Sequence, residues 1–208
     1  MARPARRSAI ALTALLALPA CASAGDRAPV PTGWRTIAKE PDRARIRTWR
    51  DAWTKALAKA RASGNADRID ALGPLLRPDA ALNDPVPPRG DYRCRVFKIG
   101  AQAQGGADFN MVAPAACRVA GDAGAVALTK IEGAQRPGGR LYPDGPNRMI
   151  FLGAMRMADE GRSLDYGADA VRDMAGVLER IGPRRWRLVL PWPRWDSLIE
   201  VVELTPAE

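Results

Sequence analysis

The 208-residue chain contains no histidine and only three cysteines. Without histidine there can be no Ser–His–Asp triad, no Cys–His nucleophile, no H-E-x-x-H zinc helix and no C-x-x-C-H haem attachment site. No two cysteines are spaced as C-x-x-C, which also excludes a structural zinc site. Walker-type phosphate loops and the dinucleotide fingerprint G-x-G-x-x-G are missing. We therefore predict that the protein holds no metal and no cofactor.

The first 24 residues have the composition of an export signal. Three arginines precede the apolar run Ala9–Ala20, which is shorter than the ~20 residues of a membrane-spanning helix. Cleavage after the A-x-A site Ala22–Ala24 would release a soluble protein. The segment Leu18–Cys21 resembles a lipobox instead, and processing there would leave a lipid on Cys21. Both routes remain open, so we predict either a soluble periplasmic protein or a membrane-anchored lipoprotein.

Both processing routes leave Cys94 and Cys117 as an even pair of cysteines in an oxidising compartment. We predict a disulfide between them, with two buried free thiols as the alternative. The bridge would close a loop of about two dozen residues, worth about 3–3.5 kcal/mol of stability by loop entropy.

The chain carries 32 basic and 23 acidic side chains, a formal charge of +9. The basic excess lies mainly between Arg35 and Arg61. A basic helix can bind nucleic acid or anionic lipid, but an exported protein meets little nucleic acid. We therefore predict a solvated basic face, no nucleic-acid partner, and membrane attachment only through a lipid on Cys21.

We predict one exported domain over residues 25–208, beginning with a helical part over 34–76. Gly64 is placed to end a first helix, and Asn65 to cap a second, shorter one. The apolar positions of the first helix recur at steps of three and four residues: Ile46, Trp49, Trp53, Ala56, Leu57 and Ala60. Five prolines between Pro74 and Gly90 then predict an extended connector over residues 77–90.

Residues 91–205 read as β-structure. Tyr92, Cys94 and Val96 alternate with Arg93 and Arg95, the pattern of a half-buried strand. Further strands are predicted at Phe109–Val112, Ala116–Ala120, Ala125–Ile131, Met149–Met157, Arg185–Leu190 and Leu198–Leu204. Residues 173–181 suit a helix or a strand, and the turn after them favours a strand. The fold class is therefore α+β: an N-terminal helical hairpin packed on a mainly antiparallel β-barrel or sandwich of about seven to eight strands.

Three segments resemble a known family of exported bacterial proteins. They are Asp91–Arg95, the pieces Gln135–Pro137 and Gly139–Gly145, and Glu179–Leu188. On these segments the chain is similar to the DUF4893 family over about Trp34 to Pro206. The resemblance implies a domain without an assigned activity, and it supplies no catalytic residues.

Two features indicate where a ligand could bind. We interpret Gln135–Arg140 as a glycine-rich connector, in which Arg136 and Arg140 could form an anion-binding nest beside free backbone amides. Trp192 and Trp195 lie between strands and could stack a ligand or grip a partner. We predict that these four side chains share one end of the β-fold, as the site of a non-enzymatic module that binds a small molecule or an envelope component.

Two alternatives stay open. Paired carboxylates can act as general acid and base or cleave glycosides. A hydrolase would therefore use acids from the set Asp144, Asp159, Glu160 and Asp165. The second alternative is a purely structural envelope protein.

Overall fold

The computed structural model describes residues 33–207, apart from 122–124, 159 and 162–163. The predicted export segment 1–24, with Cys21, and the candidate acid Asp159 lie outside the described residues. All helices and strands below belong to one unit, residues 31–208.

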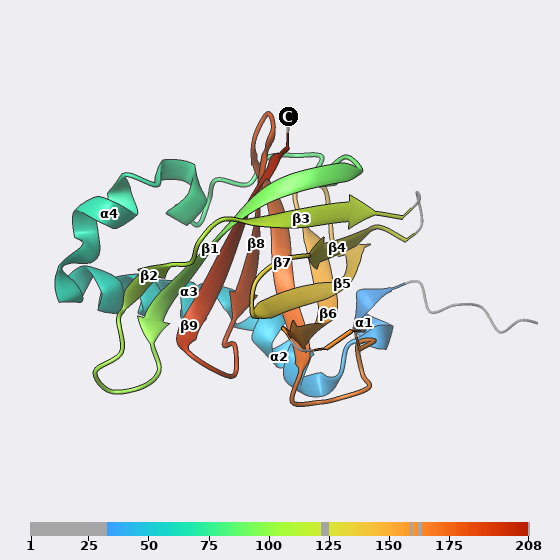
Figure 1. Cartoon of the computed structure of the whole chain (residues 1–208). Helices are drawn as coiled ribbons and strands as arrows, with labels where there is room; N and C mark the ends of the chain where they lie inside the picture. The colour runs from blue at the N-terminus through green and yellow to red at the C-terminus, as the bar shows by residue number, and fades with distance from the viewer. Residues whose placement is uncertain (1–32, 122–124, 159, 162–163, 208) are drawn as a thin grey trace, which may run out of the picture. The chain divides into compact units, whose positions relative to one another are not determined.

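Nine antiparallel strands make up the sheet (Figure 1). Eight of them close into a barrel in the order β1-β3-β4-β5-β6-β7-β8-β9, because β1 also pairs with β9 from Tyr92 to Ala101. The ninth strand, β2, pairs with the second half of β1, after β3 has paired with the first half. The strands are β1 (Gly90–Ala101), β2 (Phe109–Met111), β3 (Ala115–Ala120), β4 (Ala127–Lys130), β5 (Gln135–Pro143), β6 (Met149–Met157), β7 (Asp173–Gly182), β8 (Arg185–Pro191) and β9 (Ser197–Pro206).

The two faces of the barrel wall both bury apolar side chains, because helices cover part of the outside. Alternate residues of each strand point into the barrel. In β8, for example, Trp186, Leu188 and Leu190 pack in the interior, while Val189 packs outward against the helices. This explains why almost every residue of β7 and β8 is buried. The ambiguous segment 173–181 is therefore a strand, as the sequence favoured.

The connector predicted at Gln135–Arg140 is wrong, because these residues belong to β5. The strand pairs with both β4 and β6. Its glycines allow a close approach of two backbones: a Cβ on Gly139 would lie 2.4 Å from the Cα of Gly153, its partner in β6. Glycine in a strand often marks such an approach rather than a turn. The fold class is confirmed, with β5 as the strand that the sequence did not predict.

The helical part contains more short elements than the predicted hairpin. The helices are α1 (Trp34–Ile37), α2 (Glu40–Arg47), α3 (Trp49–Ala60) and α4 (Ala66–Asp70), with the wide turn η1 (Arg61–Asn65) and the 3-10 turn η2 (Gly73–Leu76). The chain turns at Gly64, whose φ of +83° suits glycine. Asn65 precedes α4 as predicted but forms no capping bond, and its amide instead donates to the carbonyls of Ala60 and Ser63.

The predicted apolar stripe packs on the outside of the barrel. Ile46, Trp49, Trp53 and Ala56 are buried there, with α3 lying against β1, β8 and β9 and α2 against β7. The helix and the wall approach closely at Gly100, where a Cβ would lie 3.0 Å from the Cα of Ala56. The tryptophans of this stripe therefore belong to the core.

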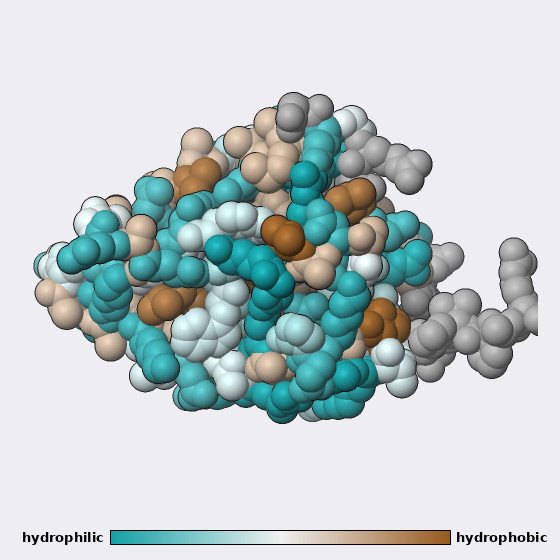
Figure 2. Space-filling view, turned by 90° about the horizontal axis from the view of Figure 1, so that it is seen from below, coloured by the Kyte–Doolittle hydropathy of each residue, from teal (hydrophilic) through white to brown (hydrophobic). Residues whose placement is uncertain are grey.

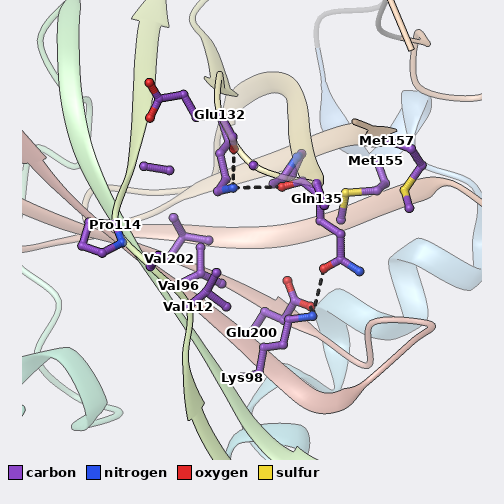
Figure 3. Close-up of a pocket in the computed structure, with 16 residues that line it drawn as sticks. Val96, Lys98, Val112, Pro114, Glu132, Gln135, Met155, Met157, Glu200 and Val202 are labelled. Atoms are coloured by element: carbon purple, nitrogen blue, oxygen red, sulfur yellow. Dashed lines mark hydrogen bonds and ion pairs between the residues drawn. The ribbon is translucent and has the colours of Figure 1, made fainter. Parts of the chain in front are cut away.

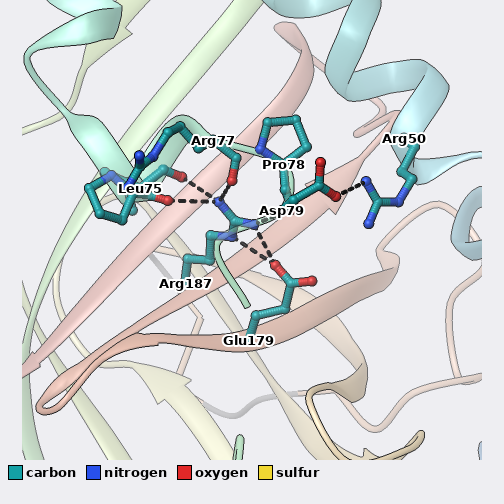
Figure 4. A network of polar contacts seen from close by, with 8 residues as sticks. Arg50, Leu75, Arg77, Pro78, Asp79, Glu179 and Arg187 are labelled. Atoms are coloured by element: carbon teal, nitrogen blue, oxygen red, sulfur yellow. Dashed lines mark hydrogen bonds and ion pairs between the residues drawn. The ribbon is translucent and has the colours of Figure 1, made fainter. Parts of the chain in front are cut away.

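The proline-rich connector is tied to the barrel by one buried arginine. Arg187 of β8 points outward, is fully buried, and donates to the carbonyl oxygens of residues 74, 75, 77 and 78 (Figure 4). Its remaining donors bind Glu179 Oε2 at 2.6 and 2.8 Å, and its guanidinium lies 4.7 Å from the Trp53 ring centroid. Leu82 then bridges to Arg180 of β7, so the connector follows the barrel wall.

Candidate cavity at the barrel mouth

A cavity of about 370 Å³ opens at one end of the barrel interior (Figure 3). Its volume lies in the range of sites that bind small molecules, about 300–1,000 Å³. Strands β1, β3, β4, β5, β6 and β9 form its wall, together with the β2–β3 and β4–β5 connections. Most of its lining is apolar: Val96, Val112, Ala113, Pro114, Ala115, Pro137, Met155, Met157 and Val202.

Charged side chains interrupt this apolar lining. Lys98 of β1, Lys130 of β4 and Glu200 of β9 occupy inward positions of their strands, where the neighbouring inward residues are apolar. Lys130 is 5% exposed and Glu200 is 3% exposed. Figure 3 shows the ends of Lys98, Gln135 and Glu200 facing one another. Lysine and glutamate are rarely buried this completely unless they are paired.

The two lysines have different kinds of partner. Lys98 Nζ donates to Gln135 Oε1 at 2.9 Å, forms an ion pair with Asp196, and lies 3.7 Å from Glu200 Oε1. Lys130 Nζ donates to the carbonyl oxygens of Glu132 at 2.5 Å and Gln135 at 3.0 Å. Burial lowers the pKa of Lys130, against the attraction of Glu132 and Glu200.

Glu200 is the least satisfied member of the cavity. Its Oε1 is buried and receives no hydrogen bond. Burial raises the pKa of Glu200, and the nearby Asp196 acts in the same direction, whereas Lys98 and Lys130 oppose the rise. A buried acceptor without a donor costs free energy, so this oxygen is the strongest single sign of a ligand-facing position.

The disulfide stands beside the cavity. Cys94 and Cys117 are bonded across the β1–β3 pair, as the cysteine count predicted. Val96, two residues beyond Cys94, and Ala115, two residues before Cys117, both line the cavity. The bridge therefore fixes the part of the wall where β1 parts from β3.

The four predicted ligand-binding residues do not meet at this cavity. Arg136 lies on the outer face of β5 and donates to the carbonyls of residues 157, 158 and 160. Arg140 is exposed and borders a separate hollow on the outer wall. Because β5 is a paired strand, its backbone amides bind neighbouring strands, which removes the basis for the predicted anion nest.

The two tryptophans lie at another place. Trp192 Nε1 donates to Thr48 Oγ1 at 3.0 Å, and Lys55 lies 5.4 Å from the centroid of its ring. Trp195 packs against the barrel interior, and both tryptophans border a hollow of only about 10 Å³. The structure thus separates the arginines from the tryptophans, and a ligand role for them stays a prediction.

The candidate acids that the structure describes do not form a pair prepared for catalysis. Asp144 accepts from Trp34 Nε1 at 3.0 Å and forms ion pairs with Arg35 and Arg148. Burial disfavours its charge, but these three donors outweigh burial and lower its pKa. The pKa of Glu160 is lowered by its bond with Arg172. A general acid at neutral pH needs a raised pKa instead, and Asp165 borders the outer hollow with Arg140.

The face shown in Figure 2 has hydrophobic residues in small, separate patches among hydrophilic ones. Among the residues that the structure describes, no helix has both the length and the hydrophobicity needed to cross a bilayer. In the same part of the chain, no three Cys, Asp or Glu side chains gather as a metal site would require.

Sequence reasoning missed the cavity residues, although a signal for them exists. Lys98 follows Tyr92, Cys94 and Val96 in the same strand phase, so a charge stands where the alternation calls for an apolar residue. Glu200 likewise lies on the same face of its strand as Val202 and Leu204, which follow it at alternate positions. A charged residue in the apolar phase of a strand indicates a polar group inside a barrel.

Comparison with known proteins identifies the domain but not an activity. No curated protein and no solved structure matches the chain. The family model of a domain of unknown function, DUF4893, matches residues 34–204. That range holds all the strands apart from the last two residues of β9, and with them every residue that lines the cavity. The chain therefore belongs to the DUF4893 family.

Proposed function

We propose that this domain is a non-enzymatic binding module that holds a small, largely apolar molecule in the mouth of its barrel. The observation that carries the proposal is the cavity of about 370 Å³ with an apolar wall and a few converging polar groups. Eight-stranded barrels leave room for one small ligand in this way. The ion pairs of Asp144 and Glu160 support binding over hydrolysis.

We further propose that the module works in the periplasm or attached to the envelope. The support for this is the predicted export segment together with a disulfide, since disulfides persist in oxidising compartments. An anchor through Cys21 would place the cavity near the membrane, where small apolar molecules concentrate.

Titration with a neutral fluorescent probe, N-phenyl-1-naphthylamine, tests the binding proposal. We expect saturable binding of one probe per chain, because the probe is apolar and small enough for the cavity. The Val112→Trp variant places a bulky side chain in the cavity and should lower probe affinity about tenfold or more, since it removes apolar surface open to the ligand.

The neighbouring residue provides a matched control. Met111 is 49% exposed on β2 and does not line the cavity. The Met111→Trp variant adds comparable bulk one residue away and should leave probe affinity within about twofold, as for an ordinary surface change. Equal losses in the two variants, or no saturable binding by the unmodified protein, would contradict the proposal.

A further inference from the structure

The hydrogen-bonding groups inside the cavity differ in how many of their donors and acceptors remain unbonded. Lys98 donates to Gln135 Oε1 and to Asp196, and Glu200 Oε1 lies 3.7 Å from its ammonium, beyond hydrogen-bond distance. Lys130 uses two of its three N–H groups on backbone carbonyls, so one donor remains.

Two more groups lack a hydrogen bond. Glu200 Oε1 is buried without a hydrogen bond. In the described part of the chain, Gln135 Nε2 forms no hydrogen bond either, because the side chain of Gln135 is bound through Oε1 alone. The cavity therefore still lacks one donor, facing Glu200, and one acceptor, facing Lys130 and Gln135.

Charged groups of both signs surround the cavity, so a ligand of either charge meets groups of its own sign. Lys98 faces Asp196 and Glu200, and Lys130 lies near Glu132 and Glu200. A ligand anion would meet Lys130, which has no ion pair within 4 Å among the described residues, but it would also lie beside the Glu200 carboxyl, which repels it. A ligand cation would meet two lysines. Burying an ion without a counter-ion of its own is costly.

Resting on the proposed function, we infer that the cavity selects a neutral amphiphile, with a short apolar chain and a hydroxyl or amide head. The head donates to Glu200 Oε1 and accepts from Lys130 Nζ or Gln135 Nε2, which satisfies both unmet requirements. The chain lies against Val96, Val202 and Met155.

Four eight-carbon compounds that differ only in their heads test this selectivity: octan-1-ol, octanamide, octanoate and octylammonium. Each is titrated at pH 7 against the complete protein loaded with N-phenyl-1-naphthylamine, and its dissociation constant is taken from displacement of the probe. We expect the alcohol and the amide to bind about tenfold or more tightly than either ion, because only they avoid an unpaired buried charge.

Variants at two positions of β9 test the role of Glu200. Glu200→Leu removes the acceptor and should weaken octan-1-ol about tenfold while the probe still binds. Glu200→Gln retains an oxygen acceptor and should keep the preference for neutral heads even if the leucine variant does not fold. The control is Glu203→Gln, because Glu203 faces the other side of the same strand toward Arg95 and Arg185, and all affinities should be unchanged.

The outcomes distinguish a failure of this head-group inference from a failure of the proposed binding function. If octanoate or octylammonium binds as well as octan-1-ol while the probe binds normally, the head-group inference is overturned and the binding module stands. The same holds if the probe binds but none of the four compounds displaces it. If neither the probe nor any compound binds, both are overturned.

Discussion

Among the buried charged side chains that the structure describes, two groups, one on each face of the barrel wall, differ in how completely they are bonded. On the outer face, every donor nitrogen of Arg187 is bound, by Glu179 or by carbonyl oxygens of the connector. On the inner face, Glu200 has a buried oxygen without a donor. The outer group joins the connector to the barrel wall with all its donor nitrogens bonded. The inner group leaves an acceptor that a further molecule could bind.

The difference has a physical reason. Burying an ion pair is tolerated only when the remaining donors and acceptors are also satisfied. The outer group meets this condition because carbonyl oxygens of the connector accept the remaining hydrogen bonds of Arg187. The inner group stands at an open mouth, where a ligand or water can complete what the chain does not. We therefore expect substitutions in the two groups to act on different properties of the protein.

The largest effect is expected from breaking the outer group. Arg187→Met leaves Glu179 and four connector carbonyls without their partner, and removing one member of a buried pair costs about 3–5 kcal/mol. Urea unfolding measures the loss in the free energy of unfolding. The double variant Arg187→Met with Glu179→Gln removes both charges and should recover part of the loss.

Probe binding gives this comparison its control. Folded Arg187→Met protein should bind N-phenyl-1-naphthylamine as the unmodified protein does, because Arg187 is on the opposite face of the wall from the cavity. A loss of affinity in protein that is still folded would show that the two groups are not independent.

The disulfide should act on both properties. Replacing Cys94 and Cys117 by alanine lowers the free energy of unfolding by about 3–3.5 kcal/mol through loop entropy. It should also weaken probe binding, because Val96 and Ala115 of the cavity wall adjoin the bridge. The unfolding midpoint and the probe titration measure the two effects. If the variant is as stable as the unmodified protein, the bridge contributes little to stability. If its affinity for the probe is unchanged, the cavity wall keeps its structure without the bridge.

The sequence predicts local structure well where one strand or helix decides it. The alternation in Tyr92–Val96 and the exact bounds of Met149–Met157 are examples, as are the tryptophans of α3 and the cysteine pair. The prediction of a connector at Gln135–Arg140 failed because a close contact with Gly153, distant in sequence, decides the structure there.

The cavity could not be assembled from the sequence for a related reason. Lys98 and Glu200 meet because β1 pairs with β9, a hundred residues away in the chain. Their positions in the apolar phase of their strands indicate a buried charge, but not which charges share a cavity. That depends on barrel closure and on which end stays open, and no local pattern encodes either.

The smallest effect, opposite in sign to the others, is expected from Glu200→Gln. Burial raises the pKa of Glu200 above its ordinary value of 4.5, so the folded protein holds this proton more tightly than the unfolded chain. Stability therefore falls as the pH rises from about 4.5 through the folded-state pKa, and stays lower above it. Glutamine does not titrate and resembles the protonated acid in shape. The variant should unfold at a higher temperature than the unmodified protein at pH 8, with the advantage vanishing below about pH 4.5.

Thermal unfolding of both proteins across this pH range separates the two descriptions of the cavity. If glutamine stabilises at high pH, the ionised Glu200 is under-compensated by Lys98 and Lys130, as the lack of a hydrogen bond to its Oε1 indicates. If glutamine destabilises there, the ionised carboxylate is held by the two lysines as firmly as Glu179 is held by Arg187. The inner group would then be a finished ion network like the outer one, and the case for a ligand donor at Glu200 would fail with it.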